Sequence, residues 1–301
     1  MLTTGGFIAV PDEQKIVVLA NLVSDREARG TVLIVPPFGK SAKDLFIFAY
    51  YLWRAGFNVF RFDARNHVGL SSGEIVNFTL SSLHKDLRLV AETLRDAGFD
   101  DLTLLCVSLS APVTFKYAAG RAGVRGIVSV IGAVDVQFAV EKAGNCSVDA
   151  YRRKDEDRLP SQTILGYDVL ADEFVRDMDT GEFSPLDSIV EAVRRAPCPV
   201  HFVMAADDDW VPPERMQRVH QVAPKGSTLT SFEGVSHEFG RSVQTTKRIC
   251  LEVCRLCGLT SGGEDEAWQV PNFAEILRAN TAEASSVDAL SRKPLGRQWK
   301  S

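Results

Sequence analysis

The feature that most constrains the fold of this 301-residue chain is an alternation of two hydrophobic patterns. Short apolar runs rich in β-branched residues alternate with longer segments in which apolar residues recur every three to four positions. The runs typical of buried strands are residues 31–35, 58–63, 102–107, 127–134, 200–206 and 228–232. Helical periodicity lies between them, as in the segment that carries Leu83, Leu87, Val90 and Leu94. This order indicates consecutive βαβ units, so the sequence predicts an α/β fold with a mostly parallel sheet flanked by helices.

Three parts of the chain depart from this alternation. Residues 6–10 and 15–23 precede it and indicate an N-terminal hairpin. Residues 135–196 contain helical patches but no strand pattern, so we expect a helical cap inserted after a late strand. We therefore predict one α/β domain over residues 1–260. The polar and irregular residues 261–301 are expected to form a C-terminal tail that is peripheral or partly disordered.

Composition and charge exclude several classes of protein. With 45% hydrophobic and 24% charged residues, the chain is neither disordered nor collagen-like. Its net charge is −5 and no run of Lys or Arg stands out, so we expect neither a nucleic-acid partner nor a polybasic membrane patch. The apolar runs are too short to span a bilayer, and the first residues lack the pattern of a signal peptide. We therefore expect a cytoplasmic protein.

The six cysteines predict neither a disulfide framework nor a metal centre. Cys250, Cys254 and Cys257 share one face of a predicted helix, but no fourth ligand is in view, and zinc sites draw ligands from at least two places. Buried helical cysteines behave as small apolar residues, and we expect that role here. Neither a metal nor a cofactor is expected.

A serine follows one of the predicted buried strands at its junction with a helix. Ser108 stands at this position, with Cys106 two residues before it and Ser110 two residues after it. A nucleophile elbow needs small residues at those two places and usually has glycines there. The motif alone is therefore weak, because a serine at a strand end often only caps the helix that follows.

A serine nucleophile needs a neighbouring base, and five histidines compete for that role. Three of them fit surface or packing positions on helices and strands, namely His84, His201 and His220. His67 lies in a loop after a strand and is the second candidate. His237 is the first candidate, because it follows the last predicted strand, at the sheet edge where α/β folds place their sites.

The base in turn needs an orienting carboxylate, expected between the serine and the histidine in the chain. Asp207, Asp208 and Asp209 follow the strand at 200–206. Asp208 is favoured because its spacing to the following Val-Pro resembles a hydrolase acid loop. Asp209 is the second choice and Asp135, after an earlier strand, is a distant third.

Acyl transfer also needs N–H donors that face the oxyanion of the transition state. One donor is expected from Leu109, directly after the serine, and the other from Phe38 or Gly39, in the turn after the strand at 31–35. Each of the four strand ends, those with Phe38 and Gly39, Ser108, Asp208 and His237, is ambiguous by itself. All of them fall in the right order at the right strand ends, which favours a serine enzyme of the α/β-hydrolase fold.

Three segments also resemble a known family. Residues 61–73 (RFDARNHVGLSSG), 166–177 (GYDVLADEFVRD) and 208–211 (DDWV) are similar to the acyl-transferase subunit of the bacterial bioluminescence fatty-acid reductase. That subunit is a thioesterase of the α/β-hydrolase superfamily that acts on myristoyl-acyl-carrier protein, and its elbow is also poor in glycine. The resemblance covers residues 30–259, but the turn at 36–39 departs from the family, so the choice between Phe38 and Gly39 stays open.

Carried over by position, the resemblance implies Ser108 as nucleophile, Asp208 as acid and His237 as base. It implies cleavage of a fatty acyl thioester, carried by acyl-carrier protein or CoA, through an acyl-enzyme that passes the chain to water or to an acceptor. A partner enzyme that takes the acyl product is implied in the same way. The alternatives are a general carboxylesterase and a hydrolase-fold binding protein without activity. We also expect Ser110 to crowd the site and slow hydrolysis.

Overall fold

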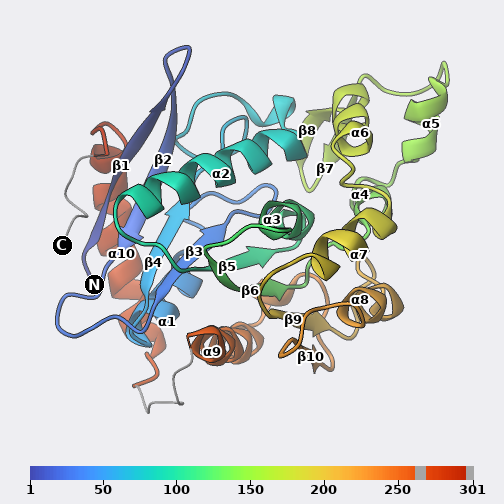
Figure 1. The fold of residues 1–301 in the computed structure, drawn as a ribbon. Helices are drawn as coiled ribbons and strands as arrows, with labels where there is room; N and C mark the ends of the chain where they lie inside the picture. The colour runs from blue at the N-terminus through green and yellow to red at the C-terminus, as the bar shows by residue number, and fades with distance from the viewer. Residues whose placement is uncertain (262–268, 296–301) are drawn as a thin grey trace.

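The computed structural model describes residues 1–261 and 269–295, and its centre is an eight-stranded sheet in the order β1-β2-β4-β3-β5-β6-β9-β10 (Figure 1). The strands are β1 (Thr3–Val10), β2 (Gln14–Asn21), β3 (Thr31–Val35), β4 (Asn58–Phe62), β5 (Leu102–Val107), β6 (Val124–Val130), β9 (Val200–Ala205) and β10 (Thr228–Phe232). β2 is antiparallel to both of its neighbours, and every pair from β4 to β10 is parallel. The predicted mostly parallel sheet is therefore confirmed.

Helices cover both faces of this sheet. On one face lie α1 (Phe46–Arg54) and α9 (Val243–Thr260), and on the other α2 (Leu80–Asp96), α3 (Ser110–Ala118), α7 (Leu186–Arg194) and α8 (Pro213–His220). Because side chains alternate along a strand, Leu104 of β5 packs into one core and Leu105 into the other. Burial on both faces explains why the central strands are continuous apolar runs. Cys250, Cys254 and Cys257 are buried on α9, in the core it forms with α1.

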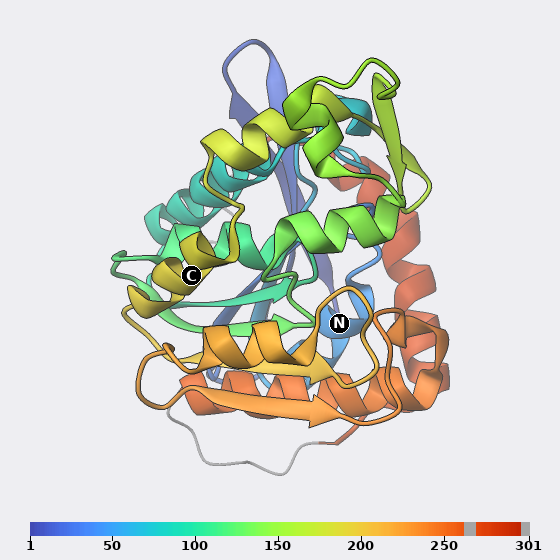
Figure 2. The ribbon, with the colours of Figure 1, turned by 90° about the vertical axis from the view of Figure 1, so that its right-hand side faces the viewer.

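The predicted cap region, residues 135–196, contains α4 (Val136–Gly144), α5 (Val148–Arg153), β7 (Ser161–Ile164), β8 (Tyr167–Leu170), α6 (Ala171–Thr180) and α7. The last of these, α7, packs beside α3 over the sheet, so the cap ends before it. In Figure 2 α5, α6 and the segment of β7 and β8 stand at the top, α4 lies between them and the lower strands, and β10 with α9 stands at the bottom. The structure differs from the sequence prediction in that β7 and β8 form a two-stranded hairpin. Leu165 and Gly166 connect them, both with positive φ. A Leu-Gly turn lacks the Asn or Asp that usually marks such hairpins, so the sequence pattern gave no signal.

The chain after α9 also differs from the predicted peripheral tail. Residues Phe273–Leu290 form helix α10, which begins with a capping box between Asn272 and Glu275 and packs against β1. Figure 1 shows α10 beside β1, on the opposite side of the molecule from the cap. The chain then adds hydrogen bonds to β1, from the Phe7 N–H to the Lys293 carbonyl and from the Leu295 N–H to the Phe7 carbonyl. The parts of that prediction at 262–268 and 296–301 lie outside the described residues.

A buried ion pair anchors α10 to the sheet. Glu283 of α10 and Arg61 of β4 are joined by two hydrogen bonds of 2.7 and 3.0 Å, and both side chains are almost fully buried. Further hydrogen bonds surround the pair: Arg61 donates to Asn21 and to the carbonyl of Ala42, and Thr3 donates to Glu283. Arg61 Nε has no hydrogen-bond partner among the described residues. Isolated buried charges are very costly, so this pair requires α10 to stay in place.

Within the described part of the chain, no helix is both long and apolar enough to cross a bilayer.

We predict that Glu283→Ala lowers the free energy of unfolding by about 3 kcal/mol or more, because it leaves the Arg61 guanidinium buried without a carboxylate. The measurement is urea denaturation of the purified variant. Asp288→Ala is the matched control on the same helix, since Asp288 pairs with Lys43 at the exposed surface. That change is expected to cost less than about 1 kcal/mol. Equal losses in the two variants would contradict the anchoring role.

Candidate active site

Ser108 occupies a sharp turn between β5 and α3. Its φ is +52°, in the left-handed region that non-glycine residues rarely adopt. Such a conformation costs about 1–2 kcal/mol and persists only where neighbouring contacts impose it. Here the Ser108 N–H donates to Val130 of β6, and the Ser108 carbonyl accepts from Ala111 and Ala133. The strain is therefore held by the ends of two buried strands and the start of α3.

Ser110 has a structural place beside this turn. Its side chain is fully buried, and its hydroxyl oxygen accepts the Val107 N–H at 2.9 Å. The hydroxyl also lies within donating distance of the Val107 and Val35 carbonyls. It thus ties the end of β5 to the end of β3. The hydroxyl is therefore directed to backbone groups, and the expected effect of Ser110 on hydrolysis stays a prediction.

Ser108, His237 and Asp208 form a continuous chain of hydrogen bonds. Ser108 Oγ lies 2.8 Å from His237 Nε2, and His237 Nδ1 lies 2.8 Å from Asp208 Oδ2. The three residues follow β5, β10 and β9, so the carboxyl edge of the parallel strands brings them together. The His237 side chain is 10% exposed and that of Asp208 is 1% exposed. The structure therefore brings together the first candidates of the sequence analysis for nucleophile, base and acid.

The Asp208 loop fixes both the carboxylate and the imidazole. Asp208 Oδ1 accepts the N–H groups of Trp210 and Val211, at 2.8 and 3.1 Å, which leaves Oδ2 for His237. The Trp210 ring packs against the His237 ring, with 4.4 Å between their centroids. These contacts determine which oxygen faces the histidine and which way the imidazole is turned.

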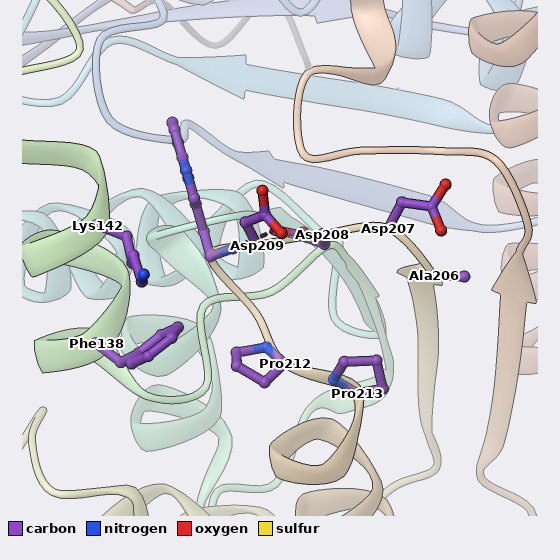
Figure 3. A pocket seen from close by; sticks show the side chains of 9 residues that line it. Phe138, Lys142, Ala206, Asp207, Asp208, Asp209, Pro212 and Pro213 are labelled. Carbon is purple, nitrogen blue, oxygen red and sulfur yellow. Dashed lines mark hydrogen bonds between the residues drawn. The ribbon is translucent and has the colours of Figure 1, made fainter.

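The alternative aspartates lie elsewhere. Asp207 and Asp209 are exposed, and Asp135 caps α4 and pairs with Arg215 at 2.6 Å. Figure 3 shows Asp207, Asp208 and Asp209 along one side of a pocket of about 670 Å³, with Phe138 and Lys142 of α4 on the other. The pocket therefore lies next to the loop that carries Asp208.

The turn after β3 lies close to a second histidine. The Gly39 N–H donates to His67 Nε2 at 3.0 Å, whereas the N–H groups of Phe38 and Leu109 donate to no acceptor in the described part of the chain. Burial lowers the pKa of His67 to about 4, and the Val68 backbone and the Asp44 carboxylate offset only part of this effect. His67 is therefore neutral at pH 7, and its Nε2 is occupied by Gly39 while Ser108 faces His237.

Aromatic rings connect this turn to the cap. We call the set Phe38, His67, Phe78, Tyr167 and Phe174 the aromatic cluster. The Phe38 ring lies 5.9 Å from His67, 5.1 Å from Phe78 and 6.1 Å from Tyr167, centroid to centroid. Phe78 also stacks on Phe174 of α6 at 6.2 Å. Sequence reasoning did not single out Phe78 or Tyr167, although Tyr167 lies in the segment 166–177 that resembled the family.

The interior of the cap is apolar and nearly filled. A small cavity there has room for about 10 Å³, and its lining is Val140, Cys146, Val148, Tyr151, Gln162, Ile164, Val169, Ala171, Phe174 and Val175. Such a space holds at most one water molecule. Phe174 belongs both to this lining and to the aromatic cluster, so the cap interior is in contact with the turn after β3.

Solved structures of low sequence identity share this architecture. Est1E from Butyrivibrio proteoclasticus, with ferulic acid bound, superposes with a TM-score of 0.68 at 15% identity, over 83% of this chain and 97% of that one. A monoacylglycerol lipase from Paleococcus ferrophilus gives 0.63 at 18% identity, over 81% and 99%. These similarities show the α/β-hydrolase fold and confirm the fold prediction.

Proteins that are similar to this chain in sequence are named acyl transferase. An acyl transferase from Shewanella hanedai is 29% identical over 288 residues, which is 94% of this chain and 92% of the relative. An acyl transferase from Vibrio harveyi is 28% identical over 258 residues, which is 84% and 83% of the two chains. The model of the acyl transferase family matches residues 3–254. The resemblance seen in the sequence is thereby confirmed, and the chain belongs to the acyl transferase family, as an acyl-transferring or hydrolytic enzyme of the α/β-hydrolase fold.

Proposed function

We propose that the protein is a serine acyl transferase or thioesterase that cleaves a fatty acyl thioester through an acyl-enzyme on Ser108. The observation that carries the proposal is the hydrogen-bond chain from Ser108 through His237 to Asp208, with 2.8 Å at each step. A hydroxyl is a weak nucleophile unless a base removes its proton, and the base works best when a carboxylate fixes its tautomer.

In the first half-reaction, Ser108 Oγ attacks the thioester carbonyl carbon while His237 Nε2 accepts the hydroxyl proton. The carbonyl oxygen becomes an oxyanion, which the Leu109 N–H and one N–H of the turn after β3 stabilise. The C–S bond then breaks, and the thiolate takes the proton from His237 to leave as the thiol. In the second half-reaction, His237 removes a proton from water or an acceptor, which attacks the ester and releases Ser108. Asp208 stabilises the imidazolium in both halves.

The acyl chain is proposed to bind under the cap. Pockets for long apolar chains are concave and lined by apolar groups, and the cap supplies such a lining next to the aromatic cluster. Its interior is nearly filled, so a long chain requires cap side chains to separate. The carrier is proposed to be acyl-carrier protein or CoA, and the product is proposed to pass to a partner enzyme or to water.

Simple ester hydrolysis is the second candidate function. The similarity of the fold to an esterase and a lipase favours it, because those structures carry the same architecture at 15–18% identity. The two candidates differ in the acyl donor, a thioester or a simple ester, and a transferase differs from either hydrolase in what accepts the acyl group from Ser108.

Ser108→Ala is predicted to reduce cleavage of acyl-CoA thioesters by about 10³-fold or more, because the nucleophile is lost. Thermal unfolding should be unchanged within a few degrees. Intact-protein mass spectrometry should show one acyl adduct on the native chain and none on the variant. Ser285→Ala is the control, since Ser285 is an exposed serine on α10, away from the Ser108 turn. A Ser108→Ala enzyme with normal turnover would exclude Ser108 as the nucleophile.

Asp208→Asn is predicted to lower kcat by about 10²- to 10⁴-fold, because an amide can hold His237 in the wrong tautomer and cannot stabilise an imidazolium. Asp209→Asn removes an equal charge one residue later, from an exposed side chain, and should change kcat by less than about twofold. Steady-state kinetics on one acyl-CoA compares the two. A greater loss from Asp209→Asn would reverse the assignment of the acid.

Acyl transfer and hydrolysis are separated by single-turnover kinetics with and without glycerol or a thiol as acceptor. A transferase should show a rapid burst of thiol release, followed by slow deacylation that the acceptor accelerates. The expected cause is the acyl chain under the cap, which excludes water from the ester. Linear kinetics that do not respond to an acceptor would indicate hydrolysis, by a simple thioesterase or an esterase.

A further inference from the structure

The turn after β3 contains two N–H groups that compete to be the second oxyanion donor. They belong to consecutive residues, Phe38 and Gly39, and only one of them has a hydrogen-bond partner among the described residues. The Gly39 N–H is already bonded to His67 Nε2 at 3.0 Å, and the Phe38 N–H has no acceptor in the described part of the chain. A donor that is held by another group cannot face an oxyanion without first breaking its own hydrogen bond.

We infer that His67 is a positioning residue, which binds the Gly39 N–H and thereby presents the N–H of Phe38, together with that of Leu109, to the oxyanion. The inference rests on the proposed function, since a donor pair is needed only if Ser108 attacks an acyl group. His67 itself does not touch the substrate in this arrangement. It acts through the backbone of the turn.

The protonation state of His67 suits this role. Nε2 can accept the Gly39 N–H only as an unprotonated nitrogen, so the ring must be neutral with its proton on Nδ1. His67 is buried to 6% exposure, and Nδ1 makes no hydrogen bond of normal geometry with a described residue. Burial thus disfavours the charged form, and Nε2 keeps its lone pair for Gly39 at neutral pH.

The packing of the turn leaves little room for other arrangements. The Phe38 ring is buried between His67, Phe78 and Tyr167. Gly39 has a φ of +73°, and a Cβ atom there would lie 2.8 Å from the Tyr167 ring. Both residues are therefore fixed by their surroundings, and the hydrogen bond to His67 sets the rotation of the peptide between them.

The test compares His67→Phe, which keeps a flat ring of similar size, with the native enzyme. Loss of the acceptor should free the Gly39 N–H and misplace that of Phe38. Removal of one oxyanion donor costs about 10²- to 10³-fold in kcat, so a misplaced donor is expected to cost about 10- to 100-fold. KM for the acyl-CoA should stay within about twofold.

A second readout separates positioning from simple destabilisation. An alkyl trifluoromethyl ketone adds to Ser108 Oγ: the new C–O bond forms, the hydroxyl proton moves to His237, and the former carbonyl oxygen becomes an oxyanion. Its affinity should fall in His67→Phe by the same factor as kcat. The affinity of a fatty alcohol of equal chain length, which forms no oxyanion, should stay unchanged.

Two further pairs of variants complete the design. His67→Gln retains an acceptor at similar reach and should recover most of kcat, whereas His67→Met has the same length and no such acceptor. This pair decides the question if His67→Phe does not fold. His84→Phe is the matched control, since His84 also packs against two aromatic rings, those of Tyr117 and Phe183, but lies on α2.

The outcomes are distinct. The inference is overturned if His67→Gln and His67→Met have equal kcat, or if His67→Phe binds the trifluoromethyl ketone with native affinity. In either case an inactive Ser108→Ala still supports the proposed function. An active Ser108→Ala overturns the proposed function and removes the basis of the inference. A parallel loss of kcat and ketone affinity in His67→Phe, with recovery in His67→Gln, supports both.

Discussion

The left-handed backbone at Ser108 is the constraint on which the candidate site depends. In this conformation, with a φ of +52°, the Ser108 hydroxyl lies at the carboxyl edge of the sheet, 2.8 Å from His237 Nε2. The conformation is unfavourable by itself. It persists because β5 lies in the centre of the sheet and because Ser110, which replaces the usual glycine, bonds to the backbone of β5 and β3. The hydroxyl of Ser110 thus helps to hold the turn that a glycine would only permit.

Much of this arrangement could be predicted from the sequence because strand patterns and chain order carry it. Parallel strands with short loops place their carboxyl ends on one edge, so Ser108, Asp208 and His237 could be selected from the strands they follow. The choice of Asp208 over its neighbours rested on spacing, and the structure adds the physical reason. Asp208 is buried with two backbone donors, while Asp207 and Asp209 are exposed.

Other parts could not be predicted because their partners lie far apart in the chain. Glu283 sits in a polar segment and gives no sign of burial until Arg61, 222 residues away, is placed beside it. The Gly39–His67 bond depends likewise on a contact between two loops, so no spacing rule could decide between Phe38 and Gly39. The hairpin of β7 and β8 was missed for a local reason, an uncommon turn sequence. Long-range pairing of polar groups is thus the main information that hydrophobic patterns do not carry.

The anchoring of α10 has a consequence for the order in which the molecule assembles. All candidate site residues lie before residue 240, and the sheet is complete at β10, so a ribosome has exported nearly the whole site before α10 emerges. Until then Arg61, in the middle of β4, has no carboxylate to neutralise it, and the carbonyl of Ala42, in the segment that follows the Phe38–Gly39 turn, depends on that same guanidinium. Arg61 of β4 is therefore expected to gain its carboxylate partner only when α10 packs against the sheet. Folding around Arg61 is thus linked to a helix that is translated after every candidate site residue.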